Sequence, residues 1–491
     1  MVSGLWQTLR GLAVDGLSNG DKAMKRNPMF FAVAAALGLA IAGPSFAATR
    51  QTDVKALQAL IQKQQDQLDQ QQKELQALRD SLQQLAGNQQ AQQQQIEKVA
   101  AVPAPAPAPA PVFSSAPGVS VALHGFVNAT AFSQDKAFTF GNGQNAEFPS
   151  VGTHGRNTGV DIRNTRFWLD FAGAKFNDNW SGGGRIEMDF FGGFNGTGAY
   201  SVSQPTPRLR QAYMDLKNAS SGSTVRIGQQ WDLLFPLDNV PTSVTHIAFP
   251  LGYGSGMIGW RFPGVVWMQD LNHGSDGPKW RLDLGGFNGN WSGPGDNINY
   301  LTAGNAGFRP QLQARLHVQD KDWLAYFVAH YAQIDLRGVD GAGATPIATT
   351  INSEGFEVGG NWHPGNWMFK GNLYTGKALG QVFGGLIQFG DIQETGGYLQ
   401  AGYKFTPNWS ANVFYASSKP KRSDVVQWLG SGSVGRLKNN QAAVNLIYTS
   451  GAYELGAEYL YSKLDTTTAA APDTTKTTKG SQVSLSAKYN F

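Results

Sequence analysis

The sequence has no cysteine, and past its N-terminal segment it has no long hydrophobic run. The missing thiols exclude a disulfide framework and a thiolate metal site. The missing apolar run excludes a membrane helix in the bulk of the chain. Neither sign of charge predominates, because 39 Lys and Arg are nearly balanced by 35 Asp and Glu, which gives a formal net charge of +4. We therefore expect no nucleic-acid partner.

Glycine and aromatic residues are abundant instead. The 491 residues include 60 Gly, 28 Phe, 15 Tyr and 13 Trp. Many of them lie in short segments where apolar and polar residues alternate. This composition and period predict an all-β protein.

The N-terminal segment has the pattern of an export signal. In residues 24–47, two basic residues precede an apolar stretch, and Ser45-Phe46-Ala47 resembles a cleavage site. We therefore predict a signal peptide over 24–47. Met24 is a better candidate than Met1 for the initiating methionine, so we interpret residues 1–23 as an over-extended start of the sequence.

Residues 48–100 carry a heptad pattern. From Val54 onward, apolar residues such as Leu68, Leu75 and Leu82 recur every seven residues among many glutamines. This favours a coiled coil, and therefore a homo-oligomer, over an unstructured glutamine tract. Alternating Pro and Ala then predict a stiff linker over 101–118 that ends the helix.

From residue 119 to 491 the chain alternates with period two, as in VALHGFVNATAF (121–132) and YELGAEYLY (453–461). Short connections lie near 175–180, 217–223, 271–278, 319–323, 363–366, 406–409 and 449–452. Long ones lie near 135–161, 191–207, 232–264, 288–307, 333–353, 377–395, 417–440 and 463–480. Their strict alternation predicts sixteen antiparallel strands closed into a transmembrane β-barrel.

Aromatic residues follow the short connections. Six of the seven lead into Trp180, Trp280, Trp323, Trp367, Trp409 or Tyr453. Because Trp and Tyr favour the membrane–water boundary, we interpret them as a girdle at one rim. The closing VSLSAKYNF (483–491) alternates to its last residue, as a strand that must pair with the first one would.

These features together resemble a known family. VALHGFVNATAF, NTRFWLDF (164–171) and the closing AKYNF resemble Gram-negative porins, and the order of signal, Gln-rich heptads, Pro-Ala linker and sixteen strands resembles the DcaP-like porins. The resemblance implies a homotrimer in outer-membrane lipids, with the coiled coil in the periplasm. It also implies uptake of small anionic solutes, in particular dicarboxylates, and recognition of Phe491 by the barrel-insertion machinery.

Cations on the polar side of the strands are candidates for lining the pore. Arginine can grip carboxylate or phosphate with two parallel hydrogen bonds, so these residues could form an anion-attracting series. Alternatively, each could pair with a neighbouring carboxylate and only fill the lumen. The candidates are Arg166, Arg185, Arg226, Arg281, Arg309, Arg315 and Lys370.

The third long connection, 232–264, is the longest. In porins of sixteen strands the third loop folds into the lumen, so the resemblance makes Asp232, Asp238 and His246 candidates for a constriction. Apolar residues 247–254 could then pack the loop against the inner wall. An external loop over the mouth is the alternative.

Catalysis is not indicated. The seven histidines have no metal-ligand spacing, and we find no nucleophile elbow or phosphate loop, so we expect no enzyme, cofactor or metal. Two other functions stay open. One is a phosphate-selective porin, and the other is an envelope tether in which the barrel anchors a periplasmic arm that reaches peptidoglycan.

Overall fold

A computed structural model describes the barrel region and a few residues between 62 and 76, which are helical. The described ranges are 112–116, 118–139, 141–152, 155–194, 203–289, 309–335, 348, 350–429 and 433–491. The predicted start at 1–23, the signal peptide at 24–47 and most of the coiled coil at 48–100 lie outside the described residues. No helix among the described residues is long and apolar enough to cross a membrane.

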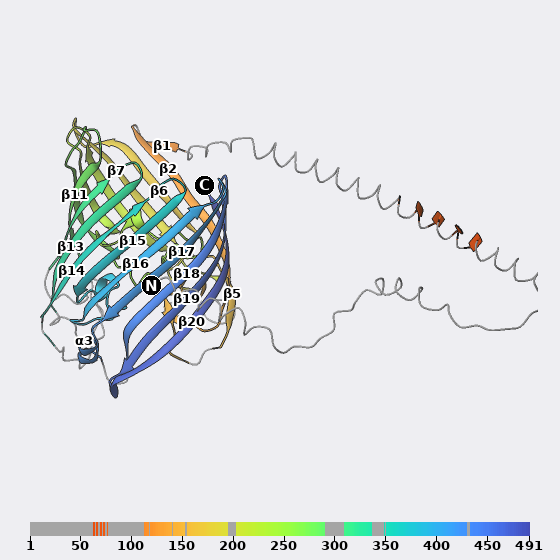
Figure 1. Ribbon diagram of the computed structural model, residues 1–491. Coiled ribbons are helices and arrows are strands. Elements are labelled where there is room, and N and C mark those ends of the chain that lie inside the picture. The colour runs from red at the N-terminus through yellow and green to blue at the C-terminus, as the bar shows by residue number, and fades with distance from the viewer. Residues whose placement is uncertain are drawn as a thin grey trace, which may run out of the picture. The chain divides into compact units, whose positions relative to one another are not determined.

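Sixteen antiparallel strands form the wall, as the sequence predicted (Figure 1). Each strand pairs with the next, and β2 pairs with both β6 and β20, so the sheet closes. The strands are β2 (Val119–Gln134), β6 (Arg166–Lys175), β7 (Trp180–Asp189), β8 (Arg208–Asn218), β9 (Ser223–Trp231), β10 (Arg261–Asp270), β11 (Lys279–Phe287), β12 (Gln311–Gln319), β13 (Trp323–Asp335), β14 (Thr350–Trp362), β15 (Trp367–Lys377), β16 (Gln393–Lys404), β17 (Trp409–Pro420), β18 (Val434–Ser450), β19 (Tyr453–Thr468) and β20 (Ala471–Asn490).

Short elements accompany the wall. Strands β1 (Val112–Ala116) and β5 (Asn157–Asp161) pair with the two ends of β2, and β3 (Phe138–Thr139) pairs with β4 (Phe148–Pro149). Single turns η2 (Gly143–Asn145), η4 (Leu237–Asn239) and η6 (Gly380–Val382) and the helix α3 (Arg422–Gln427) lie in long connections. Strand β1 occupies part of the predicted linker 101–118.

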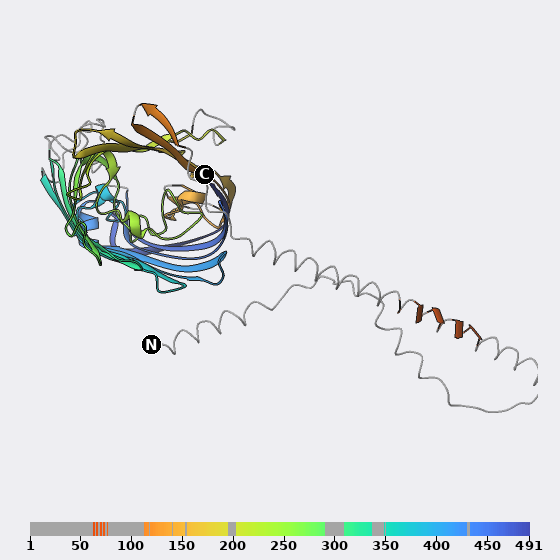
Figure 2. The same cartoon turned by 90° about the horizontal axis from the view of Figure 1, so that it is seen from above.

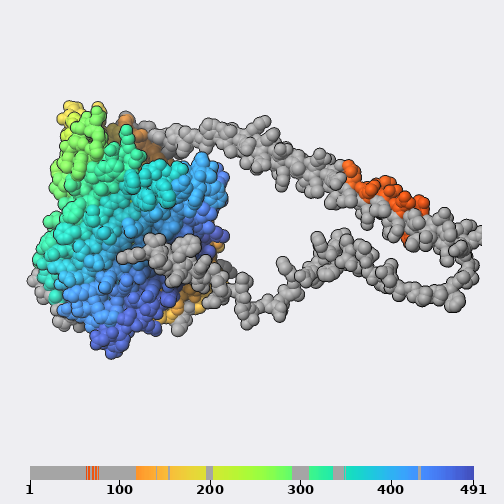
Figure 3. Space-filling model, viewed as in Figure 1, coloured from red at the N-terminus to blue at the C-terminus, as the bar shows by residue number. Residues whose placement is uncertain are grey.

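The two faces of the wall have opposite character. On β14, Phe356 and Val358 are 52% and 53% exposed, whereas Glu357 between them is 1% exposed. On β16, Leu399 is exposed and Gln400 is buried in the same way. Apolar side chains that point outward and polar ones that point inward match a barrel with lipid outside and water inside. Figure 3 shows the outer surface of the later strands, coloured teal to blue.

The short connections lie at one end of the barrel, and six of the seven lead into the predicted aromatic, whereas the connection before β9 leads into Ser223. Trp367 packs on Tyr403 with ring centroids 4.7 Å apart, and Trp409 and Tyr453 pack on Tyr448 and Tyr489, both at 4.9 Å. Phe491 closes the same end, because its N–H donates to the carbonyl of Gly125 and its carbonyl accepts from the Gly125 N–H, each at 2.9 Å.

The structure corrects one long connection. Residues 463–480 are not a loop, because β19 and β20 continue through them and Thr468 pairs with Ala471 in a tight hairpin. The many threonines of this segment suit an extended ribbon, since β-branched side chains favour strands. The preceding long connection, predicted at 417–440, is only 421–433 and contains α3.

Candidate functional site

The connection between β9 and β10, residues 232–260, lies inside the barrel and is named L3 here (Figure 2). It contacts inward-facing side chains of strands from β12 round to β20 and β2. Its backbone therefore crosses much of the inner wall instead of covering the mouth.

The first part of L3 is fixed to the middle strands. The amide of Asn239 donates to the carbonyl of Gly371 at 2.8 Å, and its own carbonyl accepts from the Tyr398 hydroxyl. The ammonium group of Lys370 donates to the Val240 carbonyl at 2.9 Å. These contacts hold η4 against β15 and β16.

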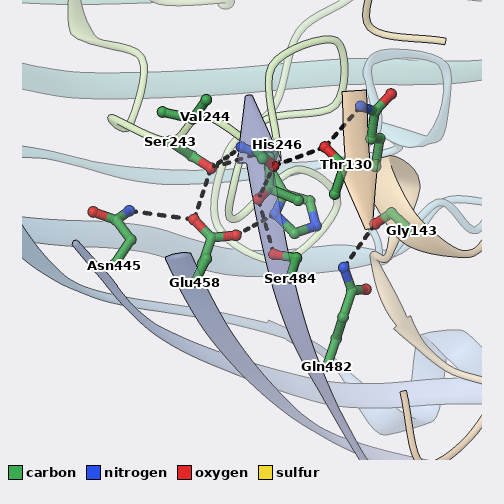
Figure 4. Close-up of polar contacts among 12 residues, drawn as sticks. Thr130, Gly143, Ser243, Val244, His246, Asn445, Glu458, Gln482 and Ser484 are labelled. Atoms are coloured by element: carbon green, nitrogen blue, oxygen red, sulfur yellow. Dashed lines mark hydrogen bonds and ion pairs between the residues drawn. The ribbon is translucent and has the colours of Figure 1, made fainter. Parts of the chain in front are cut away.

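The second part of L3 is fixed to the last strands (Figure 4). Glu458 of β19 accepts from the Ser243 hydroxyl at 2.7 Å, from His246 Nδ1 at 2.6 Å and from the Asn445 amide at 3.2 Å. The Thr245 hydroxyl lies 2.8 Å from that of Ser484 on β20. A buried carboxylate with three donors is a strong local anchor.

The third part of L3 is apolar and packs on the wall. Leu251 and Tyr253 are buried in one cluster with Tyr398 of β16 and Phe414 of β17. A Cβ on Gly252 would lie 2.8 Å from the Phe414 ring, and its φ of +81° suits glycine. The apolar segment 247–254 thus holds L3 to the inner surface.

Two further connections enter the barrel. In the connection 378–392, Phe383 packs on Tyr253 with ring centroids 4.5 Å apart and the ring planes tilted by 33°. In the connection after β2, Gln144 donates to Asn128 and Thr130 on the inner face of that strand. The interior is therefore narrowed by three connections, and the sequence indicated only L3.

Most candidate arginines are paired with carboxylates on the same strand or on a neighbouring one. Arg185 grips Asp170 with two hydrogen bonds of 2.7 and 2.9 Å, and Arg226 grips Asp215 with the same two distances. Asp283 accepts from both Arg281 and Arg315. Each of these four arginines is therefore paired with a carboxylate, which was the alternative to a series of free, anion-attracting cations.

Around Arg166 the cations outnumber the acids. Arg210 donates to Glu187 at 2.5 Å and to Asp189 at 2.8 Å, and Arg208 also grips Asp189. Nε of Arg166 lies 3.9 Å from Glu187. Arg261 and Arg210 both lie over the Trp231 ring, at 4.8 and 5.6 Å from its centroid. We name Arg166, Arg208, Arg210 and Arg261 the arginine cluster.

The arginine cluster holds four guanidinium groups against two carboxylates, Glu187 and Asp189, an excess of two positive charges. Within the described part of the chain, Nε and Nη2 of Arg166 and Nη1 of Arg261 are buried without a hydrogen-bond acceptor. Phe249 and Trp260 of L3 lie over Arg208 at 5.3 and 5.9 Å. The cluster therefore places unneutralised charge beside L3.

The remaining candidates lie apart. Arg309 donates to Gln333 at 2.7 Å, and Lys370 supports L3. The Asp238 side chain is 57% exposed, and its carboxylate lies 3.7 Å from Nε2 of His317. Asp238 is thus the acidic residue that L3 presents to the lumen.

The side chains of Asp232 and His246 are buried, unlike that of Asp238. Asp232 is buried and accepts from the Phe235 N–H and from Gln313. His246 is buried against Glu458. Both side chains anchor L3 instead of being open to a solute.

Sequence reasoning left Arg208 and Arg210 unassigned, because either parity of PRLRQAYMDL could be defended. A register shift between Glu187 and Met188 explains the ambiguity, since it lets the consecutive residues Arg210 and Gln211 both point inward and contact Glu187. Arg261 was missed because it stands at the first position of β10, beyond the predicted strand. Among the described residues no cluster of His, Cys, Asp and Glu could hold a metal.

Comparison with known proteins identifies the fold. No family model matches the chain, and no curated protein does. The crystal structure of the outer membrane channel DcaP of Acinetobacter baumannii has a TM-score of 0.58 and 20% identity, and the match covers 77% of this chain and 99% of that one.

Two more distant structures are an anion-selective porin from Comamonas acidovorans and OmpT of Vibrio cholerae. The first has 13% identity, a TM-score of 0.48 and coverage of 76% of this chain and 100% of that one. The second has 14% identity, a TM-score of 0.47 and coverage of 78% and 100%. The likeness to DcaP shows that the barrel has the fold of a porin.

Proposed function

We propose that this chain is a DcaP-like porin of the outer membrane, a water-filled channel that passes small anionic solutes, dicarboxylates above all. The positive excess of the arginine cluster carries the proposal. Four guanidinium groups face two carboxylates at the place where L3 crosses the lumen. A net positive wall at the narrow part of a wet pore raises the local concentration of anions.

Most cluster side chains are buried, so their action is mainly through the field. The guanidinium side chains of Arg166 and Arg208 are 13% and 20% exposed, and that of Arg210 only 2%. The paired but more exposed Arg185, Arg226 and Arg281 can offer direct contacts to a carboxylate. A solute would then be attracted by the cluster and guided by the exposed guanidinium groups.

Asp238 supplies the opposite charge on the L3 side. Fixed charges of both signs around a narrow passage orient dipolar solutes. A dicarboxylate, with its two separated negative ends, would meet Asp238 unfavourably unless its ends align with the arginines. This arrangement supports selection of solutes by their shape as well as by the sign of their charge.

Assembly as a homotrimer in outer-membrane lipid belongs to the same proposal. The exposed apolar wall supports a lipid environment, and the heptads of 48–100 support association of chains. Cross-linking of the purified full chain would test the trimer directly.

The decisive test is the reversal potential of the purified protein in a planar bilayer under a salt gradient. We expect anion selectivity, and partial block by a C4 dicarboxylate such as succinate. The double variant R166Q/R208Q should lose much of the selectivity. The matched control K175Q/K279Q removes two charges at the short-turn rim and should retain it.

Cation selectivity of the unmodified protein would refute the anion assignment, because it would mean that lumen carboxylates outweigh the arginines. Stronger block by inorganic phosphate than by succinate would favour the phosphate-selective alternative. Folded barrels without any conductance would refute the channel function and would favour the alternative function as an envelope tether.

A further inference from the structure

The outer wall carries a group of cations that the pore does not use. They lie at the long-connection end of β14 to β18 and line a hollow of about 810 Å³. The cations are Lys377, Lys419, Lys421, Arg422 and Lys438. We name this feature the basic hollow.

Strand parity places the basic hollow on the lipid side of the wall. On β17, Lys419 is exposed and follows Val413 and Tyr415, which are 60% and 51% exposed, in steps of two residues. On β15, Lys377 follows Leu373, which is 66% exposed, in the same way. Because side chains alternate along a strand, these lysines point outward with the apolar residues.

The charge of the basic hollow is only partly balanced. Lys377 lies 3.5 Å from Glu354, Lys421 lies 3.2 Å from Asp424, and Arg422 donates to the carbonyls of Pro472 and Thr474. The other acids in the lining are Glu394, which is buried, and Asp465, which stands opposite Lys438 in the register of β18 and β19. Within the described part of the chain, the ammonium groups of Lys419 and Lys438 have no hydrogen bond or ion pair, so both are available to a ligand.

An apolar groove continues from the basic hollow toward the middle of the wall. A hollow of about 550 Å³ shares Lys419 and Lys438 with it and is also lined by Leu373, Leu399 and Tyr415. A third hollow of about 760 Å³ shares those three apolar residues and is almost wholly apolar. Gly397, which has no side chain, keeps the groove open between Leu373 and Tyr415.

We propose that the basic hollow and its groove bind a phosphorylated lipid of the outer leaflet, with phosphate on Lys419 and Lys438 and acyl chains along Leu373, Leu399 and Tyr415. The order of cations above an apolar groove matches the order of headgroup and chains in a membrane. Lysine is a good point-charge partner for phosphate, and basic pockets on membrane proteins bind anionic headgroups. The inference rests on the outer-membrane location proposed above.

The test uses the purified full chain in a neutral detergent. Lipid A carrying two phosphates is titrated while native mass spectrometry counts bound lipid. We expect binding to the unmodified protein and at least tenfold weaker binding to K419Q/K438Q. The control K175Q/K279Q should bind as the unmodified protein does, and dephosphorylated lipid A should bind at least tenfold more weakly.

Equal binding by K419Q/K438Q, or equal binding of dephosphorylated lipid, would overturn the proposal. Displacement of lipid A by millimolar inorganic phosphate would also overturn it, since the site would then recognise free phosphate alone. A change of oligomeric state in K419Q/K438Q would identify the hollow as an interface between chains instead. The bilayer reversal potential is a separate readout, so a working channel without lipid binding refutes only this inference.

Discussion

Removal of the Glu458 carboxylate should release the middle of L3 from the wall. Glu458 is buried and accepts three hydrogen bonds, from Ser243, His246 and Asn445. Truncating one partner of a buried charged contact costs about 3–5 kcal/mol. Glu458→Gln keeps one acceptor oxygen and should cost about 1–3 kcal/mol, the cost of leaving a buried polar group without its partner.

These costs translate into exposure of L3. About 3 kcal/mol corresponds to roughly a hundredfold change in an equilibrium, and about 1.4 kcal/mol to tenfold. The flanking contacts of Val240 with Lys370 and of Ala248 with Asn164 remain, so only the segment between them should open.

The chain has no cysteine, so one introduced thiol reports the opening. Val244 is 3% exposed, and V244C should react slowly with a maleimide. We expect E458A to accelerate the labelling about a hundredfold and E458Q about tenfold. Glu454→Ala is the matched control, because Glu454 lies on the same strand but pairs with Lys488 at 2.7 Å.

The anchoring role would be refuted if the labelling rate of V244C/E458A were within twofold of that of V244C alone. The barrels must still show heat-dependent gel mobility in that comparison. In a double-mutant cycle with His246→Ala, we expect a coupling energy of about 0.5–3 kcal/mol, as for residues in direct contact.

Three further predictions concern selectivity, closure and pH. Arg166→Ala should lower the anion-to-cation permeability ratio about fourfold, since one charge ~10 Å away in water favours an anion and disfavours a cation by ~0.4 kcal/mol each; an unchanged reversal potential contradicts this. Gly125→Val should block closure of β2 on β20, because a Cβ there would lie 2.6 Å from the Phe491 ring and from the Arg166 carbonyl. Gel mobility of unheated samples should show unfolded chains for G125V and folded barrels for the outward-facing control A131V. Partial burial acts to raise the pKa of the Asp424 carboxyl, but hydrogen bonds from the Gln393 N–H, Ser423 and Lys421 lower it overall. A lowered folded-state pKa means that this stabilisation is present above the ordinary pKa of about 3.9 and is lost as the pH falls through the folded value. Hydrogen exchange in α3 should therefore rise below about pH 4, while D424N should show no such step.

The wall could be predicted from sequence because its signals are local. Period-two alternation, the aromatic after six of the seven short turns and the alternation of short and long connections each depend on neighbours in the chain. The hairpin at 463–480 was mistaken for a loop because its residues are polar on both faces, so the apolar alternation that marks a membrane strand is missing there.

The interior could be predicted only in part, because it depends on contacts between distant residues. The inward parity of Arg185 and Arg226 follows from their strands, but their carboxylate partners lie on other strands. The anchoring of His246 by Glu458 joins residues 212 positions apart. Nothing local in either segment indicates that contact.

The anchoring of L3 also sets an order for assembly. L3 lies between β9 and β10, yet it is bonded to Glu458 and Asn445 and to Ser484 on β20. The residues that hold its second part are therefore synthesised 203 to 239 positions later. L3 can take its final position only once the C-terminal strands are in place, so narrowing of the lumen is a late event in biogenesis, concurrent with the seam between Phe491 and Gly125.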